Sequence, residues 1–190
     1  MTDASQANAS DTADASMAAP VVEGAPEASL EITTEKLAGR ARRICAAIAV
    51  PCSVEHLWQV LTDYDNLSSF IPNLTLSRRL EATPTGTRLE QIGAQCFLNI
   101  QFCARVVLDM VEQFPHRLGF SMVEGDFKSF EGCWTLEPTD NADQAETRLV
   151  YELTVCPPRA IPTVLIERHL RRDLAQNLQA IRQHAIALAS

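Results

Sequence analysis

Hydrophobic and polar residues alternate over most of the chain from residue 40 onward, and a period of two is typical of β-strands. The clearest run covers residues 97–114, with the sequence FLNIQFCARVVLDMVEQF. Along it the apolar and the polar residues fall on opposite sides: Leu98, Ile100, Phe102, Ala104, Val106, Leu108 and Met110 on one, and Asn99, Gln101, Cys103, Arg105 and Asp109 on the other. The pattern predicts a sheet with one dry face and one face of mixed character.

Turn-forming residues divide this part of the chain into further strands. They occur at 83–86, 115–116, 125–126 and 138–143, between the segments TLSRRLEA, TRLEQIGAQ, RLGFSMVEG, SFEGCWTLEP and TRLVYELTVCP. An earlier segment, RARRICAAIAV, alternates in the same way and stops at Pro51, which cannot donate a hydrogen bond within a sheet. We therefore expect about seven strands in antiparallel order.

Two short helical segments are predicted directly after the first strand. Ser53 is a natural N-cap, and the residues after it carry an apolar stripe at helical spacing, namely Val54, Leu57, Trp58 and Leu61. Asp65 and Asn66 favour a turn, a second short helical segment is expected around 66–70, and Pro72 prevents it from continuing.

The chain ends in a long amphipathic helix of about 25 residues, or about 37 Å at 1.5 Å per residue. Its expected apolar stripe is Ile166, Leu170, Leu174, Leu178, Ile181 and Ala185, with Arg168, Arg171, Arg172, Asp173 and Gln176 turned away. Such a helix needs a broad apolar surface, and the dry face of a curved sheet is the candidate. The predicted class is therefore α+β.

Composition separates the chain into two parts. Residues 1–38 are rich in Ala, Ser, Thr, Asp and Pro, and residues 1–39 hold most of the net charge of −8, with Lys36 as the one basic residue. We expect 1–38 to be a disordered acidic tail and 39–190 to be one domain. The nearly neutral domain disfavours nucleic acid as a partner, and the absence of a signal-peptide pattern favours the cytoplasm.

Motifs for metal, cofactor or covalent chemistry are missing from the sequence. Six cysteines without a C-x-x-C pair suggest reduced thiols rather than disulfides or a zinc site. His56, His116, His169 and His184 lie far apart along the chain, with His169 and His184 expected on the last helix away from its stripe. No cofactor is expected, and hydrolase, NTPase and dinucleotide-binding proteins lack their characteristic residues here.

Three segments resemble the START-like (SRPBCC) superfamily, in the branch that groups polyketide cyclase/dehydrases with coenzyme Q-binding START-like proteins. They are VPCSVEHLWQVLTDYDNLSSFIPNL, VEGDFKSFEGCWTLEP and LIERHLRRDLAQNLQAIRQHA. The second is similar to versions of the domain in photosynthetic organisms. In the first, the family pattern falls on Trp58, Leu61, Asp63, Tyr64, Phe70 and Pro72. The resemblance covers roughly residues 40–188.

The resemblance implies a helix-grip fold, in which the sheet wraps around the long helix and leaves a lipophilic cavity. The ligand would be an isoprenoid quinone, such as coenzyme Q or plastoquinone, or another lipid, and the protein would carry it without catalysis. The side chains expected to line the cavity are Trp58, Tyr64, Phe70, Phe102, Val106, Met110, Phe120, Met122, Phe130, Trp134, Tyr151, Leu170 and Leu174.

The sequence leaves several alternatives open. The aromatic residues at alternating positions suit a closed core as well as a cavity wall. Arg105, Asp109 and Glu124 suit a solvated face, but in a cyclase/dehydrase-like enzyme they would be polar or acid/base groups inside the cavity. The apolar loop at 70–74, with Arg168, Arg171 and Arg172, would suit transient contact with a membrane surface. Ribosome association, as in a toxin-like member of the family, would need a basic surface.

Overall fold

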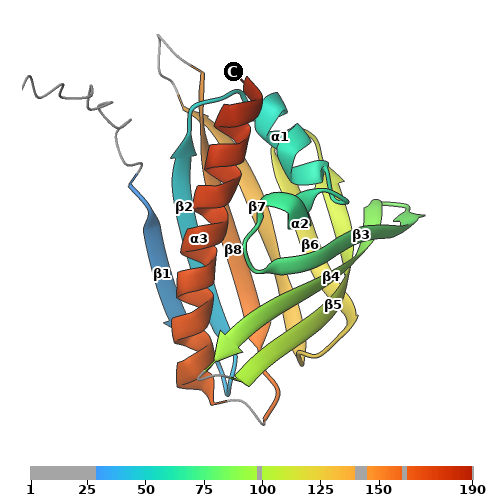
Figure 1. Cartoon of the computed structure of the whole chain (residues 1–190), viewed down its shortest axis with the longest axis vertical. Coiled ribbons are helices and arrows are strands. Elements are labelled where there is room, and N and C mark those ends of the chain that lie inside the picture. The colour runs from blue at the N-terminus through green and yellow to red at the C-terminus, as the bar shows by residue number, and fades with distance from the viewer. Residues whose placement is uncertain (1–28, 98–99, 140–144, 160–161, 190) are drawn as a thin grey trace, which may run out of the picture.

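The computed structural model describes residues 29–97, 100–139, 145–159 and 162–189, and Figure 1 shows the whole chain. The strands are β1 (Glu31–Lys36), β2 (Arg42–Val50), β3 (Leu74–Thr83), β4 (Gly86–Phe97), β5 (Ile100–Gln113), β6 (Arg117–Gly125), β7 (Ser129–Thr139) and β8 (Glu146–Cys156). The helices are α1 (Val54–Thr62), α2 (Leu67–Phe70) and α3 (Thr163–Ala189).

All eight strands belong to one antiparallel sheet in the order β1-β2-β8-β7-β6-β5-β4-β3. The sheet is strongly curved: β2, β8 and β7 run along the length of the molecule, whereas β3, β4 and β5 cross it (Figure 1). The three helices lie on the same side of the sheet. Helix α3 runs along β2, and α1 and α2 lie toward the C-terminal end of α3. The predicted α+β helix-grip fold is confirmed.

The local signals in the sequence explain where the helices begin and end. Ser53 caps α1, because its side-chain oxygen accepts a hydrogen bond from the backbone N–H of His56 at 3.2 Å. The predicted short helix around 66–70 is α2. The long helix has 27 residues, and Pro162 directly precedes it, where its missing N–H is tolerated.

Two boundaries differ from the prediction. Residues 31–36 were assigned to the disordered tail but form the edge strand β1, whose residues pair with β2 from Glu31↔Ala47 to Lys36↔Arg42. Residues 1–28 of the predicted tail lie outside the described residues. The run at 97–114 was predicted as a single strand. In the structure β4 ends at Phe97 and β5 begins at Ile100, and these two residues pair with each other.

The closed part of the core lies where α1 meets α3. Leu57 of α1 and Leu178 of α3 are fully buried there, together with Leu149 and Ala185. On α3 the buried core residues are Leu174, Leu178, Ile181 and Ala185, and Leu170, nearer the start of the helix, is only partly buried. Among the described residues, no helix is long and apolar enough to cross a membrane.

Candidate ligand-binding cavity

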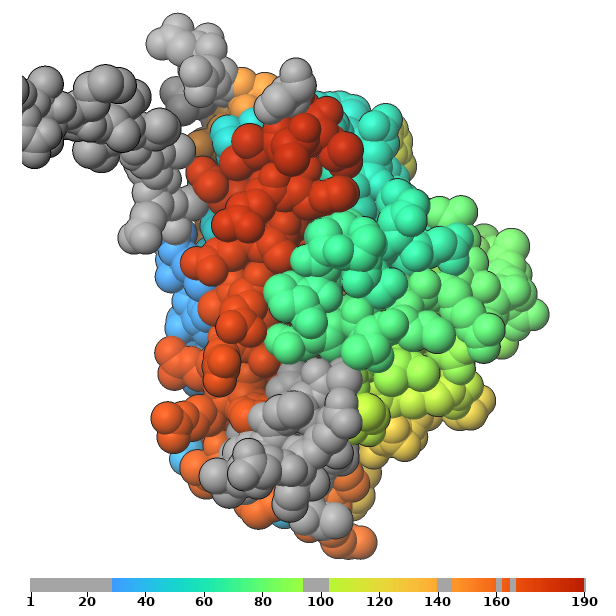
Figure 2. All heavy atoms as spheres, in the orientation of Figure 1, coloured from blue at the N-terminus to red at the C-terminus, as the bar shows by residue number. Residues whose placement is uncertain are grey.

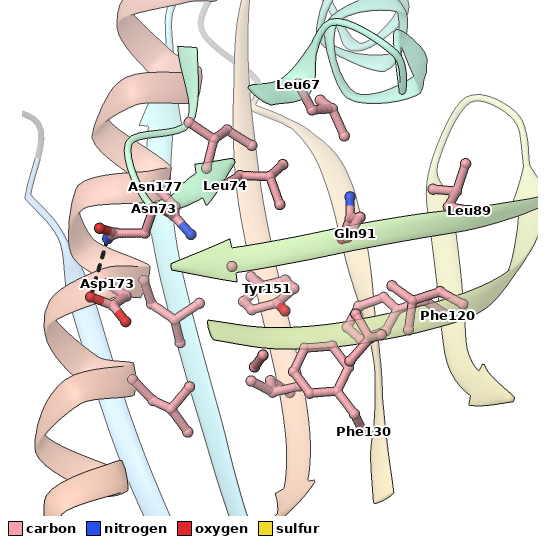
Figure 3. Close-up of a pocket in the computed structure, with 18 of the residues that line it drawn as sticks. Leu67, Asn73, Leu74, Leu89, Gln91, Phe120, Phe130, Tyr151, Asp173 and Asn177 are labelled. Carbon is pink, nitrogen blue, oxygen red and sulfur yellow. Dashed lines mark hydrogen bonds between the residues drawn. The ribbon is translucent and has the colours of Figure 1, made fainter. Parts of the chain in front are cut away.

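A cavity of about 580 Å³ lies between the concave face of the sheet and the N-terminal half of α3 (Figure 3). Its size falls within the range of about 300–1,000 Å³ typical of small-molecule sites. Most of its wall is apolar and comes from β3 to β8, α1, α2 and α3. These lining residues include Leu61, Leu67, Ile71, Leu74, Leu89, Ala104, Val106, Leu108, Met110, Leu118, Leu153, Leu170, Leu174 and Ile181.

Aromatic side chains form the wall on the sheet. Trp134 of β7 and Tyr151 of β8 are directly paired across the two strands, and their ring centroids lie 3.9 Å apart. Phe120 of β6 lies 5.7 Å from Phe130 and 5.8 Å from Tyr151, centroid to centroid. The result is a continuous apolar surface that suits a flat ring or a flexible hydrocarbon chain.

Several polar side chains lie on the α3 side of the cavity, whereas Gln91 lies on the sheet side (Figure 3). The Asn73 side-chain Nδ2 donates hydrogen bonds to Asp173 Oδ1 at 3.2 Å and to Gln176 Oε1 at 3.3 Å. Asn177 lies one turn after Asp173, and both line the cavity with Gln91 of β4 (Figure 3). Burial raises the pKa of Asp173 to about 6, although the nearby Arg172 acts in the opposite direction.

Tyr64 provides a further polar group near α1. Its hydroxyl donates a hydrogen bond to Glu112 Oε1 at 3.0 Å, and the Arg79 guanidinium lies 5.4 Å from the centre of its ring. Burial, followed by the negative charge of Glu112, raises the pKa of the Tyr64 hydroxyl. Tyr64 is therefore a neutral hydrogen-bonding group at ordinary pH.

Nine of the thirteen side chains expected to line the cavity do so: Tyr64, Val106, Met110, Phe120, Phe130, Trp134, Tyr151, Leu170 and Leu174. Their contact with a ligand stays a prediction. Phe102 lies outside the side chains that the structure describes.

Three expected lining residues lie elsewhere. Trp58 is buried among the core residues, and its ring lies perpendicular to that of the largely exposed Phe114, with centroids 5.4 Å apart. Phe70 stacks on His184 of α3 at 4.0 Å. Met122 packs half-buried against the core. The family pattern thus includes residues that anchor α1 and α2 rather than face the cavity.

Arg105 and Asp109 lie on the outer face of the sheet, because they alternate along β5 with the cavity-lining Val106 and Met110. Glu124 of β6 lies on the same face, because a register shift pairs it with Val107 and it forms an ion pair with Arg105. Arg105 forms ion pairs with Glu90 and Glu124, each at 2.6 Å. Arg88 binds Asp109 through both carboxylate oxygens and lowers the pKa of that carboxyl. These groups form a network of ion pairs outside the cavity, which fits the solvated-face interpretation of the three residues and not the acid/base alternative.

The polar cavity residues were missed or misplaced by the sequence pattern. Asp173 was expected to turn away from the apolar stripe of α3, and His169 likewise, yet both line the cavity. The spacing contains a usable signal, because Asp173 lies three residues after Leu170 and Asn177 three after Leu174. Residues at such spacing share one face of a helix.

A family model described as "polyketide cyclase / dehydrase and lipid transport" matches residues 50–182. The chain belongs to this family. Among curated proteins, the ribosome association toxin RatA of Escherichia coli strain K12 is 27% identical over 113 residues, which cover 59% of this chain and 69% of RatA.

Solved structures of related fold agree with this family. The Zhui aromatase/cyclase from Streptomyces sp. R1128 superposes with a TM-score of 0.67 at 13% identity, covering 79% of this chain and 96% of Zhui. The STAR-related lipid transfer protein from Xanthomonas axonopodis gives a TM-score of 0.66 at 16% identity, covering 82% of this chain and 93% of that chain. At such identities these likenesses show the fold, and the family description adds cyclase/dehydrase chemistry or lipid transport.

Proposed function

We propose that the protein binds one hydrophobic ligand in the cavity between the sheet and α3 and carries it. The ligand would be an isoprenoid quinone, such as coenzyme Q or plastoquinone, or another lipid. The observation that carries the proposal is the apolar cavity of about 580 Å³, which the N-terminal half of α3 leaves unfilled.

The physical properties of the cavity are sufficient for carriage without chemistry. At about 30 Å³ for each water-sized group, it has room for roughly 15 to 20 heavy atoms, which is enough for a quinone ring with its first isoprene unit, so the rest of a longer chain would extend out of the cavity. Each buried methylene contributes about 0.8 kcal/mol, so eight carbons would supply roughly 6 kcal/mol before the cost of ordering the ligand. The family description, which includes lipid transport, supports this proposal.

An enzyme of the cyclase/dehydrase kind is the second candidate. One observation favours it: a carboxyl group, Asp173, lines the cavity with a pKa raised to about 6, which suits proton transfer near neutral pH. The likeness to the Zhui aromatase/cyclase supports the same candidate. In that case the bound molecule would be a polyketide-like chain, and Asp173 would be the acid/base group.

Cellular context follows from the carrier proposal. We place the carrier in the cytoplasm, with transient contact at a membrane surface where the ligand is exchanged. Arg168, Arg171 and Arg172 are exposed on α3 and suit anionic lipid headgroups. Ribosome association, which the name of RatA states for that protein, is disfavoured here by the net charge of −8.

The test is chemical identification of what the protein carries. The full chain is purified from its own organism, extracted with organic solvent, and the extract is analysed by liquid chromatography and mass spectrometry. A quinone or other lipid in near-stoichiometric amount supports the carrier. A ring-closed product supports the cyclase, and an empty protein contradicts carriage.

A further inference from the structure

The curved sheet meets α3 along two lines, one on each side of the helix. On one side α3 packs along β2, where an ion pair between Arg42 and Glu167 at 3.3 Å and a hydrogen bond from Arg182 Nε to the Ala49 carbonyl at 3.2 Å hold the helix. On the other side the far edge of the sheet, β3, and the segment before it return to α3. We call this second line, where residues 70–74 meet α3, the seam.

The seam is a thin part of the cavity wall. Ile71, Asn73 and Leu74 line the cavity on one side of it, and Asp173 and Leu174 of α3 line it on the other. Ile71, Asn73 and Leu74 are only half-buried, so they separate the cavity from solvent with a single layer of side chains. Figure 2 shows α2 and the start of β3 lying against α3 at the surface of the molecule. A displacement of this segment away from α3 would therefore open the cavity.

Side chains hold the seam together. Among the described residues, no backbone hydrogen bond joins the segment 67–74 to α3. The Asn73 side chain donates hydrogen bonds to Asp173 and Gln176, and the ring of Phe70 stacks on His184 with centroids 4.0 Å apart and planes 7° apart. Neighbouring strands of the sheet, by contrast, are joined by ladders of backbone hydrogen bonds. Opening the seam therefore costs less than separating two strands.

The segment is also weakly fixed at both of its ends. Helix α2 has only four residues, and the side chain of its N-cap residue, Asn66, makes no capping hydrogen bond. At the other end, the pairing of β3 with β4 has a register shift between Leu74 and Leu76, so the first residue of β3 is set apart from the regular ladder. Very short helices and irregular strand ends open locally at a low free-energy cost.

We propose that the seam is the route by which the ligand enters and leaves the cavity, through movement of residues 67–74 away from α3. This inference rests on the proposed function, and it applies to the carrier and to the cyclase alike, because both take a hydrophobic molecule into the same cavity. The contacts across the seam exist only in the closed state. Weakening them raises the population of the open state, which speeds entry and exit equally while the closed state still predominates. The seam therefore controls the rate of ligand exchange and not the affinity.

Exchange kinetics of a fluorescent probe test the route. The probe is 1-aminoanthracene, a flat neutral dye that fluoresces in apolar surroundings, and stopped-flow mixing with the full chain gives its association and dissociation rate constants. The double variant Gln176→Ala/His184→Ala weakens the seam at two positions that do not line the cavity. We expect both rate constants to rise about tenfold, as for the loss of one hydrogen bond and one ring contact, and Kd to stay nearly unchanged.

Two control variants weaken the hold on α3 away from the seam. His56→Ala removes the hydrogen bond from His56 Nε2 of α1 to the Ala185 carbonyl at 2.9 Å, on the same turn of α3 as His184. Glu167→Gln removes the ion pair with Arg42 on the β2 side of the helix. Neither control should change the two rate constants, and thermal unfolding checks that all variants are folded.

The other outcomes overturn the proposal in distinguishable ways. Unchanged rate constants in the folded double variant, or faster exchange in Glu167→Gln instead, would show that the ligand passes elsewhere, while the cavity still binds it. Faster exchange in His56→Ala to the same degree would mean that general loosening of α3, and not the seam, controls exchange. A rise in the dissociation rate constant alone would mean that Gln176 or His184 holds the ligand. If the wild type does not bind the probe, the proposed function fails and the route fails with it.

Discussion

Asn73 donates a hydrogen bond to Asp173 across a gap of 100 residues in the sequence, with 3.2 Å between Nδ2 and Oδ1. Asn73 directly precedes the edge strand β3, and Asp173 lies in the N-terminal half of α3. The bond therefore joins the edge of the sheet to the helix that covers it. It also brings a carboxyl group into a cavity whose wall is otherwise largely apolar.

Removing this link should loosen the wall of the cavity. Asn73→Ala deletes the donor to both Asp173 and Gln176, and we expect the free energy of unfolding to fall by about 1 kcal/mol. Urea denaturation measures the change. Asn66→Ala is a matched control, because Asn66 makes an exposed hydrogen bond to Asp63 and should cost less. An equal loss in the two variants would contradict a special role for Asn73.

The raised pKa of Asp173 predicts how stability depends on pH. Its folded-state pKa of about 6 lies above the value of about 3.9 expected in the unfolded chain. Between these two pH values the carboxyl of Asp173 is deprotonated in the unfolded chain but still protonated in the folded protein. Its contribution to the free energy of unfolding is therefore complete below about pH 4 and is lost as the pH rises through about 6. Arg172 and His169 on α3 are the neighbouring charged or titratable groups, and Asn73 faces Asp173 from the sheet edge.

Asp173→Asn removes this dependence. We expect the variant to gain stability relative to the wild type as the pH is raised from 4 to 7, measured by urea denaturation at each pH. A constant difference between the two proteins over that range would show that Asp173 titrates normally.

Asp109 and Glu124, on the outer face of the sheet, should not affect how much ligand the protein binds. Asp109 forms an ion pair with Arg88, which lowers the pKa of the Asp109 carboxyl. The ion pair therefore stabilises the fold above about pH 4, and this stabilisation is lost as the pH falls further and Asp109 is protonated. Asp109→Asn and Glu124→Gln should leave the amount of extractable ligand unchanged, with a small decrease in melting temperature. A loss of ligand in a folded variant would place these groups in the functional site after all.

Gly132 leaves the space into which Phe120 and the backbone of β8 pack. A Cβ atom at this position would collide with the backbone oxygen of Glu152 and lie 2.7 Å from Phe120 Cζ. Gly132→Ala should therefore destabilise the protein by about 1–3 kcal/mol. In Gly119→Ala the new Cβ would meet its nearest atom at 3.5 Å, an ordinary contact, so thermal unfolding of this control should show little change.

Alternation along single strands predicted which face of the sheet is dry, and this explains why Val106, Met110 and Phe120 were placed correctly on the helix side. A local pattern contains no information about where a helix stops filling the space above a sheet. It therefore could not separate Trp58, which fills the closed core, from Tyr64, which lines the cavity.

The stripe of α3 shows a second limit of the sequence pattern. Asp173 was classed by polarity as a surface residue, but its position is set by the path of the helix over a curved sheet. The strand β1 was missed for a related reason. It is polar and short, and only pairing with β2, which is a tertiary contact, makes it a strand.

Native mass spectrometry of the protein purified from its own organism tests the central claim most directly. The mass of the intact wild type is compared with that of Ala104→Trp, which fills the cavity, and of Ala82→Trp, which adds the same side chain at an exposed position on β3. We predict a bound hydrophobic molecule on the wild type and on Ala82→Trp, and its loss from Ala104→Trp. Equal occupancy in all three proteins, or none in the wild type, would contradict a ligand carried in this cavity.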